Sequence, residues 1–506
     1  MNAIATVKIH PAIGIARVGN SRTDLFVGPE LPNDRSPPRG GYKDRSLRVK
    51  RQAARFRVFG YDAGGNLVKE LLTSDATITW TVHLANKKAA WRRFEGLQQD
   101  TAYRNAGVAD RDSLIIDPGP RSLSVENDVA QFDSGSFQGT NVSLGEIQTD
   151  EDGRLLVLGG FGRSESPTNA PLETFANNDG WFDDVSDGPV TATVKLSDTN
   201  QKIEAAGAWV IVCPPNFAPP IDSIITLYDV LLQVAVDKLG LILPDKPSFT
   251  RDIYPILDRA MKMKWVSKLA GSAHQTLARA IPPPGSDALR NAIFQRLRNP
   301  NDGSGADMPM IWSDNYRTQA ATHARAHLMV DSEAENQPLT KTQYRMMKQW
   351  KDGDFINDWT GQPVPEKQIT PSGLDRAALE PCVGGAFYPG IEVGWLMRDV
   401  YPFDEAFRLS HSGLSAGDIT KQMALPWQAD FNDCKQEDPL AWWPAQRPDD
   451  VFSARGTHQV AWTRGIVSSP AEMIRYWHRL GFVVQQGDRY LETGRKPRRK
   501  TTRGIS

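Results

Sequence analysis

The chain has 506 residues, of which 40% are hydrophobic and 24% are charged, and its formal net charge is −1. This composition is typical of a soluble globular protein with about two to four domains. A nearly neutral chain lacks the overall field that favours nucleic acid or a membrane surface, so neither partner is predicted. No run approaches the roughly 20 apolar residues that a membrane helix needs, and Met1–Val7 lacks the basic and apolar pattern of a conventional signal peptide.

Cysteine is sparse, with Cys213, Cys382 and Cys434 as the three examples. An odd, small number of thiols argues against a disulfide scaffold and indicates folding in a reducing compartment such as the cytoplasm. Three thiols also exclude a tetrahedral zinc site made of cysteines alone within one chain.

The first half of the sequence predicts a β-rich domain over residues 1–215. Runs of β-branched and aromatic residues separated by turn signals predict strands there. The predicted strand segments are Thr6–Ile15, Arg55–Phe59, Thr77–Leu84, Leu155–Leu158, Val190–Leu196 and Ala208–Val212. Several strands at short spacing with few helices between them favour a sandwich-like architecture.

The pattern changes at the proline-rich stretch Cys213–Pro220, which we take as the domain boundary. Apolar residues then recur at helical spacing. The predicted helices are Asp222–Leu239, Thr250–Met263, Ala288–Arg298, Gln319–Val330 and Thr340–Lys351. The sequence therefore predicts an α+β protein, with a mainly helical domain over residues 222–493 and a basic, solvated tail over residues 494–506.

Familiar catalytic signatures are missing from the sequence. No G-x-G-x-x-G follows a predicted strand, since Gly159–Gly162 does not fit that spacing, and there is neither a P-loop nor a G-x-S-x-G motif. His323 and His327 would share one face of a helix, as metal ligands can. No third ligand is evident, so two surface histidines are the competing interpretation.

Residues 372–395 form the first segment of functional interest. Ser372 and Asp375 fit a capping box that would start a short helix, and Pro381 would end it. Cys382 is therefore expected at a helix end, beside the glycine pair 384–385, which allows close backbone approach.

A second segment, residues 420–434, contains Trp427 after a proline and three residues before Asp430. Taken together, the two segments resemble the lysine 6-oxidase and glycine oxidase family, whose members carry the cofactor cysteine tryptophylquinone. Further segments resemble the same family in the same order, namely His10–Ser21, His83–Trp91, Leu339–Phe355, Trp442–Pro448 and a late predicted helix, Glu472–Val483. Ordered matches over most of the chain are more specific than one short motif, although this chain is shorter than the better-known members.

The resemblance implies a cofactor built from the chain itself. It places the sulfur at Cys382 and favours Trp427 as the modified tryptophan, with Trp443, and less so Trp442, as rivals. Unmodified side chains lack an electrophilic carbonyl that accepts two electrons, whereas a quinone carbonyl can condense with a primary amine. The implied activity is oxidative deamination of a primary amine, expected to be that of an amino acid, with O₂ reduced to H₂O₂ and ammonia released.

The reaction needs a carboxylate base in a partly desolvated site. The candidate carboxylates are Asp375, Glu380, Glu392 and Asp430. The family's critical acid precedes the cysteine, which puts Asp375 and Glu380 first, although Asp375 is equally suited to cap its helix. His411 could orient the substrate or a carboxylate, and a surface histidine is its competing interpretation.

Partners also follow from the resemblance. A separate flavoprotein is expected to mature the cofactor, the protein is expected to be a homo-oligomer, and export without a conventional signal is compatible with the family. Three alternatives stay open: a catalytically silent relative that binds a ligand, a quinone oxidase acting on a peptide-bound or carrier-bound amine, and a metal enzyme using His323 and His327. Cys213 is expected in the core, and Cys434 is undecided.

Overall fold

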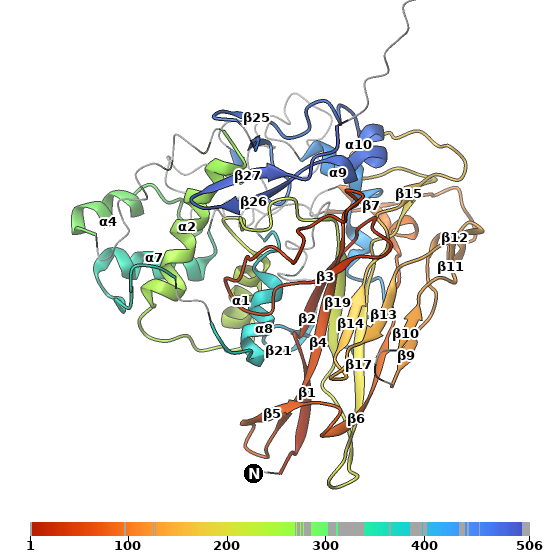
Figure 1. Ribbon diagram of the computed structural model, residues 1–506, viewed down its shortest axis with the longest axis horizontal. Coiled ribbons are helices and arrows are strands. Elements are labelled where there is room, and N and C mark those ends of the chain that lie inside the picture. Colours follow the sequence, from red (N-terminus) through yellow and green to blue (C-terminus); the bar gives the residue numbers. More distant parts are fainter. Residues whose placement is uncertain are drawn as a thin grey trace, which may run out of the picture.

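Strands fill the first 213 residues of the chain, and helices α1 to α10 follow them (Figure 1). The computed structural model describes residues 3–95, 98–124, 126, 128–268, 270, 274, 277, 285–301, 310–311, 339–363, 366–384, 397, 402–434, 441–442, 445–454 and 456–497. The predicted helix over residues 319–330, with its two histidines, lies outside these residues, as does most of the basic tail.

One 13-stranded sheet organises the β-rich half. Its strands are β1 (Thr6–His10), β2 (Ile13–Arg17), β3 (Leu25–Val27), β4 (Arg51–Tyr61), β5 (Leu67–Leu71), β6 (Ala76–Val82), β9 (Arg121–Leu123), β10 (Val129–Gln131), β13 (Glu146–Thr149), β14 (Leu155–Leu158), β17 (Asp187–Leu196), β18 (Lys202–Glu204) and β19 (Ala208–Cys213). All six predicted strand segments overlap observed strands, although Thr77–Leu84 runs two residues past the end of β6 and Thr6–Ile15 covers β1 and the start of β2.

The sheet curls toward a barrel. Its main path runs β10-β13-β14-β4-β2-β19-β17-β6-β9, and the two end strands lie near each other. Arg121 Nε on β9 donates to Gln131 O at the end of β10 over 2.8 Å. The prediction of an α+β fold with a β-rich first half is confirmed, and the structure adds that one curled sheet carries the N-terminal core.

Short two-stranded ribbons decorate this framework. They are β7 (Arg92–Glu95) with β8 (Gln98–Tyr103), β11 (Gly135–Phe137) with β12 (Thr140–Val142), β15 (Ser164–Glu165) with β16 (Phe182–Asp183), β20 (Met310–Ile311) with β23 (Ala441–Trp442), β21 (Phe403–Glu405) with β22 (Arg408–Leu409), β24 (Asp450–Phe452) with β25 (Gln459–Ala461), and β26 (Phe482–Gln486) with β27 (Arg489–Thr493). The β20–β23 pairing joins two segments that are far apart in the sequence.

Helices pack on one side of the sheet. They are α1 (Leu227–Lys238), η3 (Phe249–Ile253), α2 (Tyr254–Lys262), η4 (Met263–Trp265), α4 (Asp287–Phe294), α7 (Lys341–Asp352), α8 (Pro371–Leu379), η8 (Thr420–Gln422), α9 (Trp427–Asp433), α10 (Pro470–Tyr476) and η9 (Trp477–Arg479), with η1 (Lys88–Ala90) and η2 (Asp112–Leu114) inside the β-rich half. None of the described helices is long and apolar enough to cross a membrane.

Two helix predictions need correction at their ends. Helix α8 is capped by Thr370, whose side chain accepts from Gly373 N, so the proposed capping box of Ser372 and Asp375 is wrong. Thr370 directly precedes Pro371. Proline suits the first helical position because it lacks the backbone N–H group that would otherwise have no partner there. The predicted helix Glu472–Val483 is too long, because the chain turns after η9 and enters β26.

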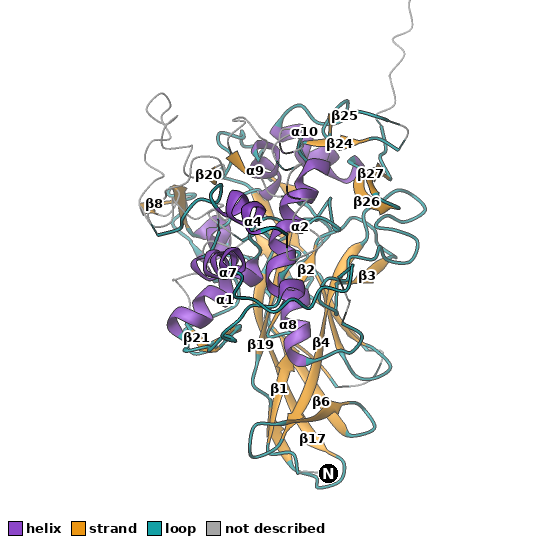
Figure 2. Cartoon of the chain, turned by 90° about the vertical axis from the view of Figure 1, so that its left-hand side faces the viewer, coloured by secondary structure: helices purple, strands orange, loops and turns teal. Residues whose placement is uncertain are grey.

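Strands β2 and β19 run parallel at the centre of the sheet and carry side chains to both faces. On one face Ile13, Ile15 and Trp209 join a buried apolar cluster. Helices α1 and α8 cover this face (Figure 2), and Leu227 of α1 and Leu379 of α8 belong to the same cluster. The alternation of β side chains therefore fixes where the ends of these two helices rest.

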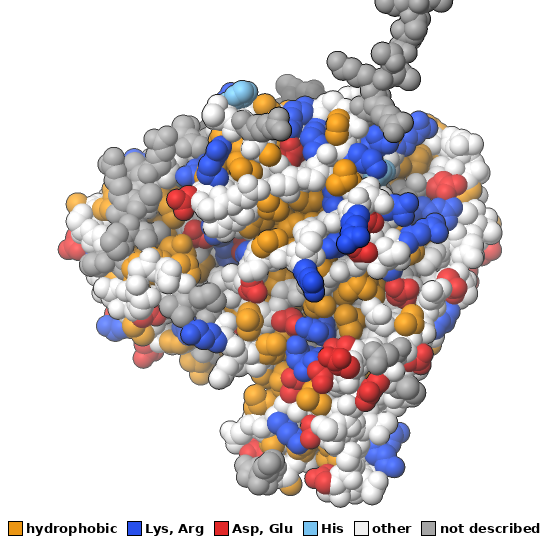
Figure 3. Space-filling view, viewed as in Figure 1, with side chains coloured by type: hydrophobic (Ala, Val, Ile, Leu, Met, Phe, Trp, Pro, Cys, Tyr) orange, Lys and Arg blue, Asp and Glu red, His pale blue; other side chains and the backbone are white. Residues whose placement is uncertain are grey.

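The outer face near β4 is ionic. Figure 3 shows acidic and basic side chains interleaved low on this face of the molecule. Glu30 pairs with both Arg55 and Arg57, and Glu70 pairs with Arg57 and Arg154. Mixed charge of this kind keeps a large exposed sheet face soluble and stops it from pairing with another sheet.

Phe56 offers a test of the sheet's packing. Its ring is fully buried and lies against Gly14 of β2, where even a Cβ atom would come within 2.3 Å of the ring. We expect Phe56→Ala to lower the free energy of unfolding by about 3–5 kcal/mol through the lost burial and the cavity left behind. Urea unfolding followed by tryptophan fluorescence measures this. Leu67→Ala, at a side chain that is 47% exposed, should change it by no more than about 0.5 kcal/mol; equal losses would refute this view of the core.

Candidate active site

Cys382 lies where α8 ends and α1 begins. It is 1% exposed, and its backbone N–H donates to Leu379 O over 3.2 Å. Its carbonyl accepts from Leu227 N, the first residue of α1, over 3.0 Å. The expected position at a helix end is therefore observed, and two hydrogen bonds to different helices fix the backbone that carries the sulfur.

A buried arginine contacts this sulfur. Arg17, the last residue of β2, places Nη2 within 3.5 Å of Cys382 Sγ and 3.2 Å of Pro381 O. Its Nη1 donates to Pro214 O over 2.8 Å. A guanidinium in this position stabilises negative charge on sulfur, and the thiolate is the nucleophilic form of cysteine.

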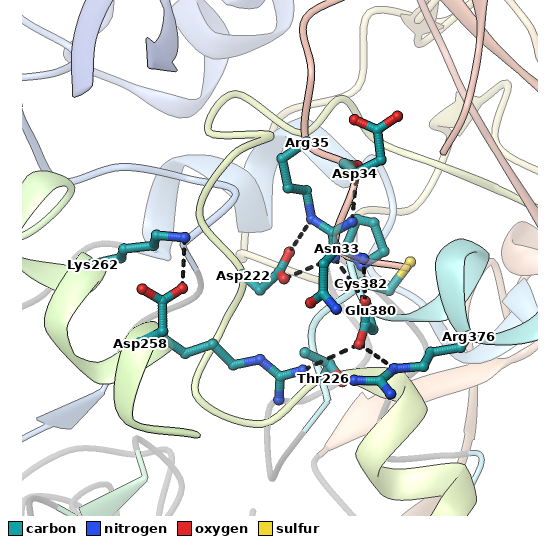
Figure 4. A network of polar contacts seen from close by, with 12 residues as sticks. Asn33, Asp34, Arg35, Asp222, Thr226, Asp258, Lys262, Arg376, Glu380 and Cys382 are labelled. Atoms are coloured by element: carbon teal, nitrogen blue, oxygen red, sulfur yellow. Dashed lines mark hydrogen bonds and ion pairs between the residues drawn. The ribbon is translucent and has the colours of Figure 1, made fainter. Parts of the chain in front are cut away.

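Glu380, two residues before the cysteine, is fully buried among arginines (Figure 4). Its oxygens lie 2.6 Å from Arg376 Nε, 3.1 Å from Arg35 Nη2 and 3.8 Å from Arg259 Nη2. Burial alone would raise the pKa of Glu380, but the positive charges of the three arginines outweigh it and lower the pKa to about 2. A carboxylate held in this way is a poor proton acceptor near neutral pH.

Asp375 also has fixed partners. It is 6% exposed and faces the corner between β1 and β2. Its Oδ1 accepts from Ala12 N over 2.6 Å, and both carboxylate oxygens lie 3.1 Å from His10 Nδ1. The other ring nitrogen of His10 lies 3.3 Å from both Tyr61 Oη and Arg408 Nη2. Asp375 thus ties α8 to the sheet.

Trp427 begins α9 and is fully buried. Its indole packs edge-on against Phe431 and Trp477, with ring centroids 5.4 and 5.6 Å away. Its backbone N–H donates to Asp183 Oδ2 over 3.0 Å, and that carboxylate pairs with the buried ammonium of Lys88. Trp427 and Cys382 belong to separate apolar clusters, so the structure does not bring this pair together.

The other cysteines are free thiols in different surroundings. Cys213 is buried on β19 in the same apolar cluster as Cys382. The Sγ of Cys434 lies 3.6 Å from Asp430 Oδ2. Burial raises the pKa of the Cys434 thiol well above its usual value, and the negative charge of Asp430 raises it further. This thiol therefore stays protonated and unreactive.

His411 packs against β19. Its Nε2 lies 3.1 Å from Ala208 O, and its ring meets Trp209 edge-on. Burial lowers the pKa of His411, so the neutral imidazole packs against the start of this strand. Glu392, Trp443, His323 and His327 lie outside the described residues, and no three His, Cys, Asp or Glu side chains form a metal-binding group within the described part of the chain.

One loop, residues 214–226, contacts both the segment that carries Cys382 and the family segment Trp442–Pro448. Asn216 Nδ2 donates to Pro381 O over 3.4 Å. Phe217 N donates to Gln446 O over 2.9 Å, and Ala445 N donates to Ser223 Oγ over 3.3 Å. This loop therefore links residues 445–446, which follow Trp443 closely, to Pro381, the residue before Cys382.

Sequence reasoning missed Arg17, Arg35 and Gln446. Gln446 is 2% exposed, and neither its amide nitrogen nor its amide oxygen has a partner. Such a group is costly unless a ligand or water satisfies it. Arg17 and Gln446 lie inside family segments, but no residue pattern marks any of the three as part of the site, so only packing reveals their roles.

Glu380 gives the site a testable dependence on pH. Its pKa is lowered from 4.5 to about 2 in the folded protein. Its stabilisation is therefore present above pH 4.5 and is lost as the pH falls through about 2. We expect Glu380→Gln to lower the free energy of unfolding at pH 7 by about 3–5 kcal/mol, because it breaks a buried ion cluster, and to flatten the acid limb of the stability curve. Urea unfolding across pH measures both. Glu366→Gln, at an exposed glutamate, is the control, and an unchanged acid limb in Glu380→Gln would rule out this ionised state.

Comparisons with known proteins agree over most of the chain. Models of the L-lysine epsilon-oxidase N-terminal and C-terminal domains match residues 10–212 and 326–454. The L-lysine 6-oxidase of Marinomonas mediterranea is 32% identical over 85% of this chain and 71% of that protein.

Solved structures give the same result. The structure of the epsilon-lysine oxidase from Marinomonas mediterranea superposes with a TM-score of 0.78 at 26% identity, covering 97% of this chain and 95% of that one. The Schiff base intermediate of that bacterium's L-Lys epsilon-oxidase with L-Lys gives 0.77 at 25% identity with the same coverage. The chain therefore belongs to the L-lysine epsilon-oxidase family, a family of oxidoreductases that oxidise amino acids with a quinone derived from their own side chains.

Proposed function

We propose that this protein oxidises the primary amine of an amino acid through a cysteine tryptophylquinone whose sulfur is that of Cys382. The carbon that bears the amine loses two electrons and two protons, water supplies the carbonyl oxygen, ammonia leaves, and O₂ takes up the electrons and protons as H₂O₂. The observation that carries the proposal is the buried sulfur of Cys382 against Arg17, inside the C-terminal region that matches the family.

The residues around Cys382 fit the sulfur half of this cofactor. The thiol is shielded from solvent, forms no disulfide and lies beside a donor that stabilises thiolate. Hydrogen bonds to Leu379 and Leu227 hold its backbone still. When formed, the quinone supplies the electrophilic carbonyl and two-electron capacity that ordinary side chains lack.

The tryptophan half has three candidates, of which Trp427 and Trp443 lead and Trp442 is the weaker rival. Sequence resemblance favours Trp427, which the structure places in a separate apolar cluster from Cys382. Trp443 precedes Ala445, whose backbone is held by the same loop that contacts Pro381. A thioether requires the sulfur and the ring to touch, so we infer that Trp443 is the better partner.

We assign Glu380 and Asp375 positioning roles in this reaction. Glu380 holds Arg35 and Arg376 around the turn that carries Cys382, and Asp375 holds α8 on the sheet. Both carboxylates are already engaged by several donors, so neither is well placed to take the proton from the substrate carbon. We therefore propose Glu392 or Asp430 as the proton acceptor.

Maturation requires oxygen insertion into the tryptophan ring, and we propose that a separate flavoprotein performs it in the cytoplasm. We further propose that the mature enzyme is a homo-oligomer and that an export route without a conventional signal is open to it. An amine on a peptide or carrier remains the second substrate class, which tethered and free amines compared in a peroxide assay would separate.

Peptide mapping tests the cofactor directly. Protein co-expressed with its flavoprotein should yield a Cys382 peptide joined covalently to a tryptophan peptide, with two oxygens added and the hydrogens of the cross-link and quinone lost. Intact mass and tandem mass spectrometry identify the tryptophan. If Cys382 alkylates freely and every tryptophan keeps its unmodified mass after co-expression, the protein is a silent relative and the oxidase proposal fails.

Matched variants separate the roles of cysteine and tryptophan. We expect Cys382→Ser to abolish both the cross-link and peroxide production, because no thioether can form. Cys213→Ala, in the same apolar cluster, should retain both. Trp443→Phe should abolish the cross-link, whereas Trp427→Phe should retain it and lose only the stability expected from trimming a buried ring. The opposite pattern for the two tryptophans would return the assignment to Trp427.

A further inference from the structure

A cavity of about 280 Å³ opens beside the residue that precedes Cys382. We call it the Lys50 cavity. Its wall includes Arg17, Asp34, Arg35, Tyr42, Lys50 and Pro381. Its size is just below the range of roughly 300–1,000 Å³ that is usual for ligand pockets, which suits a molecule as small as an amino acid.

Lys50 is the unusual residue of this wall. It is 7% exposed, and its Nζ donates to one protein acceptor, Arg39 O, over 2.9 Å. Among the described residues, no carboxylate lies within ion-pair distance of this ammonium. A buried ammonium normally has a counter-ion, because removing the charge from water is costly. Two of its three donors are therefore available to an anion.

The two arginines and the glutamate that line the cavity already have partners. Arg35 pairs with Asp222 and Glu380. Arg17 donates to backbone carbonyls and to the sulfur of Cys382, and Glu30 pairs with arginines of β4. Lys50 thus differs from Arg35 and Glu30 in having no opposite charge against it among the described residues.

The rest of the wall suits an aliphatic chain with charged ends. Tyr42 stacks on Phe482 with ring centroids 5.1 Å apart, and Phe26 meets Tyr42 edge-on at 5.5 Å. The carboxylate of Asp34 accepts from Ser36 N over 2.9 Å and also lines the cavity. Figure 4 shows Asp34 turned away from the guanidinium of Arg35.

The cavity reaches the site already described. Pro381 and Arg17 both line it, and Arg17 Nη2 lies 3.5 Å from Cys382 Sγ. A molecule that fills this cavity would therefore contact Arg17 and Pro381, the two wall residues next to Cys382.

We propose that the Lys50 cavity is a carboxylate-binding site and that Lys50 holds the carboxylate of the amino acid whose amine is oxidised. This assignment rests on the proposed function for the identity of the ligand, but the carboxylate site itself stands on the cavity and its unpaired ammonium. Lys50 is then a specificity-determining residue, which separates amino acids from amines that lack a carboxylate.

The first test uses the unmodified chain, so that it does not depend on the cofactor. L-Norleucine has the carboxylate and aliphatic chain of lysine but no terminal amine to oxidise. Isothermal titration calorimetry should show saturable binding that weakens at least about tenfold in Lys50→Met, since an ion pair in a desolvated site is lost, and that recovers in Lys50→Arg. Lys202→Met, at a side chain that is 70% exposed, is the matched control. No binding, or equal binding in Lys50→Met, would overturn the site.

Stability without ligand separates this role from a structural one. Lys50→Met removes an uncompensated buried charge and keeps the chain length, so its melting temperature should be equal to or above that of the parent protein. A clear decrease would show that Lys50 serves the fold instead.

The second test uses the mature enzyme and a pair of amines. Lys50→Met should raise KM for L-lysine at least about tenfold and leave KM for 1,5-diaminopentane, the same molecule without its carboxylate, nearly unchanged. Norleucine binding that depends on Lys50 in a chain that makes no peroxide would sink the oxidase proposal and keep the site. Peroxide production with the same KM for lysine in the parent protein and in Lys50→Met would refute the carboxylate site and keep the oxidase proposal.

Discussion

The arrangement around Glu380 is the contact on which the rest of the site depends. One fully buried carboxylate meets three guanidiniums that come from three places in the chain: Arg35 from the loop before β4, Arg259 from α2 and Arg376 from α8. Burying the Glu380 carboxylate without a positive partner would be strongly unfavourable, and burying the guanidiniums without a negative partner would be unfavourable too. Each partner therefore requires the others, and together they fix the end of α8, where Cys382 must be held for its chemistry.

Much of the fold was predictable because its signals are local. The run over residues 155–158 and the run over residues 208–212 are strands because β-branched and apolar side chains fill buried, pleated positions. Helix ends were less predictable, since several residues near a helix start can act as the cap. At α8 the sequence offered Ser372, and the chain uses Thr370 because the proline that follows it suits the first helical position.

The site was predictable only where a residue lies inside a recognisable segment. Cys382 could be singled out from its helix end and its family segment. Arg35 and Lys50 lie in no such segment, and Arg17 lies in one that does not reveal its contact with the sulfur; all three arrive from the β-rich half, more than 300 positions away along the chain. The roles of Asp375 and Glu380 depended on partners that are just as distant, His10 and Arg35, so the sequence could name these carboxylates without deciding between catalysis and support.

Glu380 and Lys50 show how surroundings separate a supporting charge from a binding charge. Both side chains are buried within the same region, and the loop of residues 33–42 lies near each of them. Three arginines surround Glu380, so its carboxylate stays ionised and is held in place. Lys50 has a single carbonyl and no negative charge, so the folded chain carries the desolvation cost of an ammonium that gains its counter-ion only from outside. An incoming carboxylate would supply that counter-ion in a site that the fold has already formed.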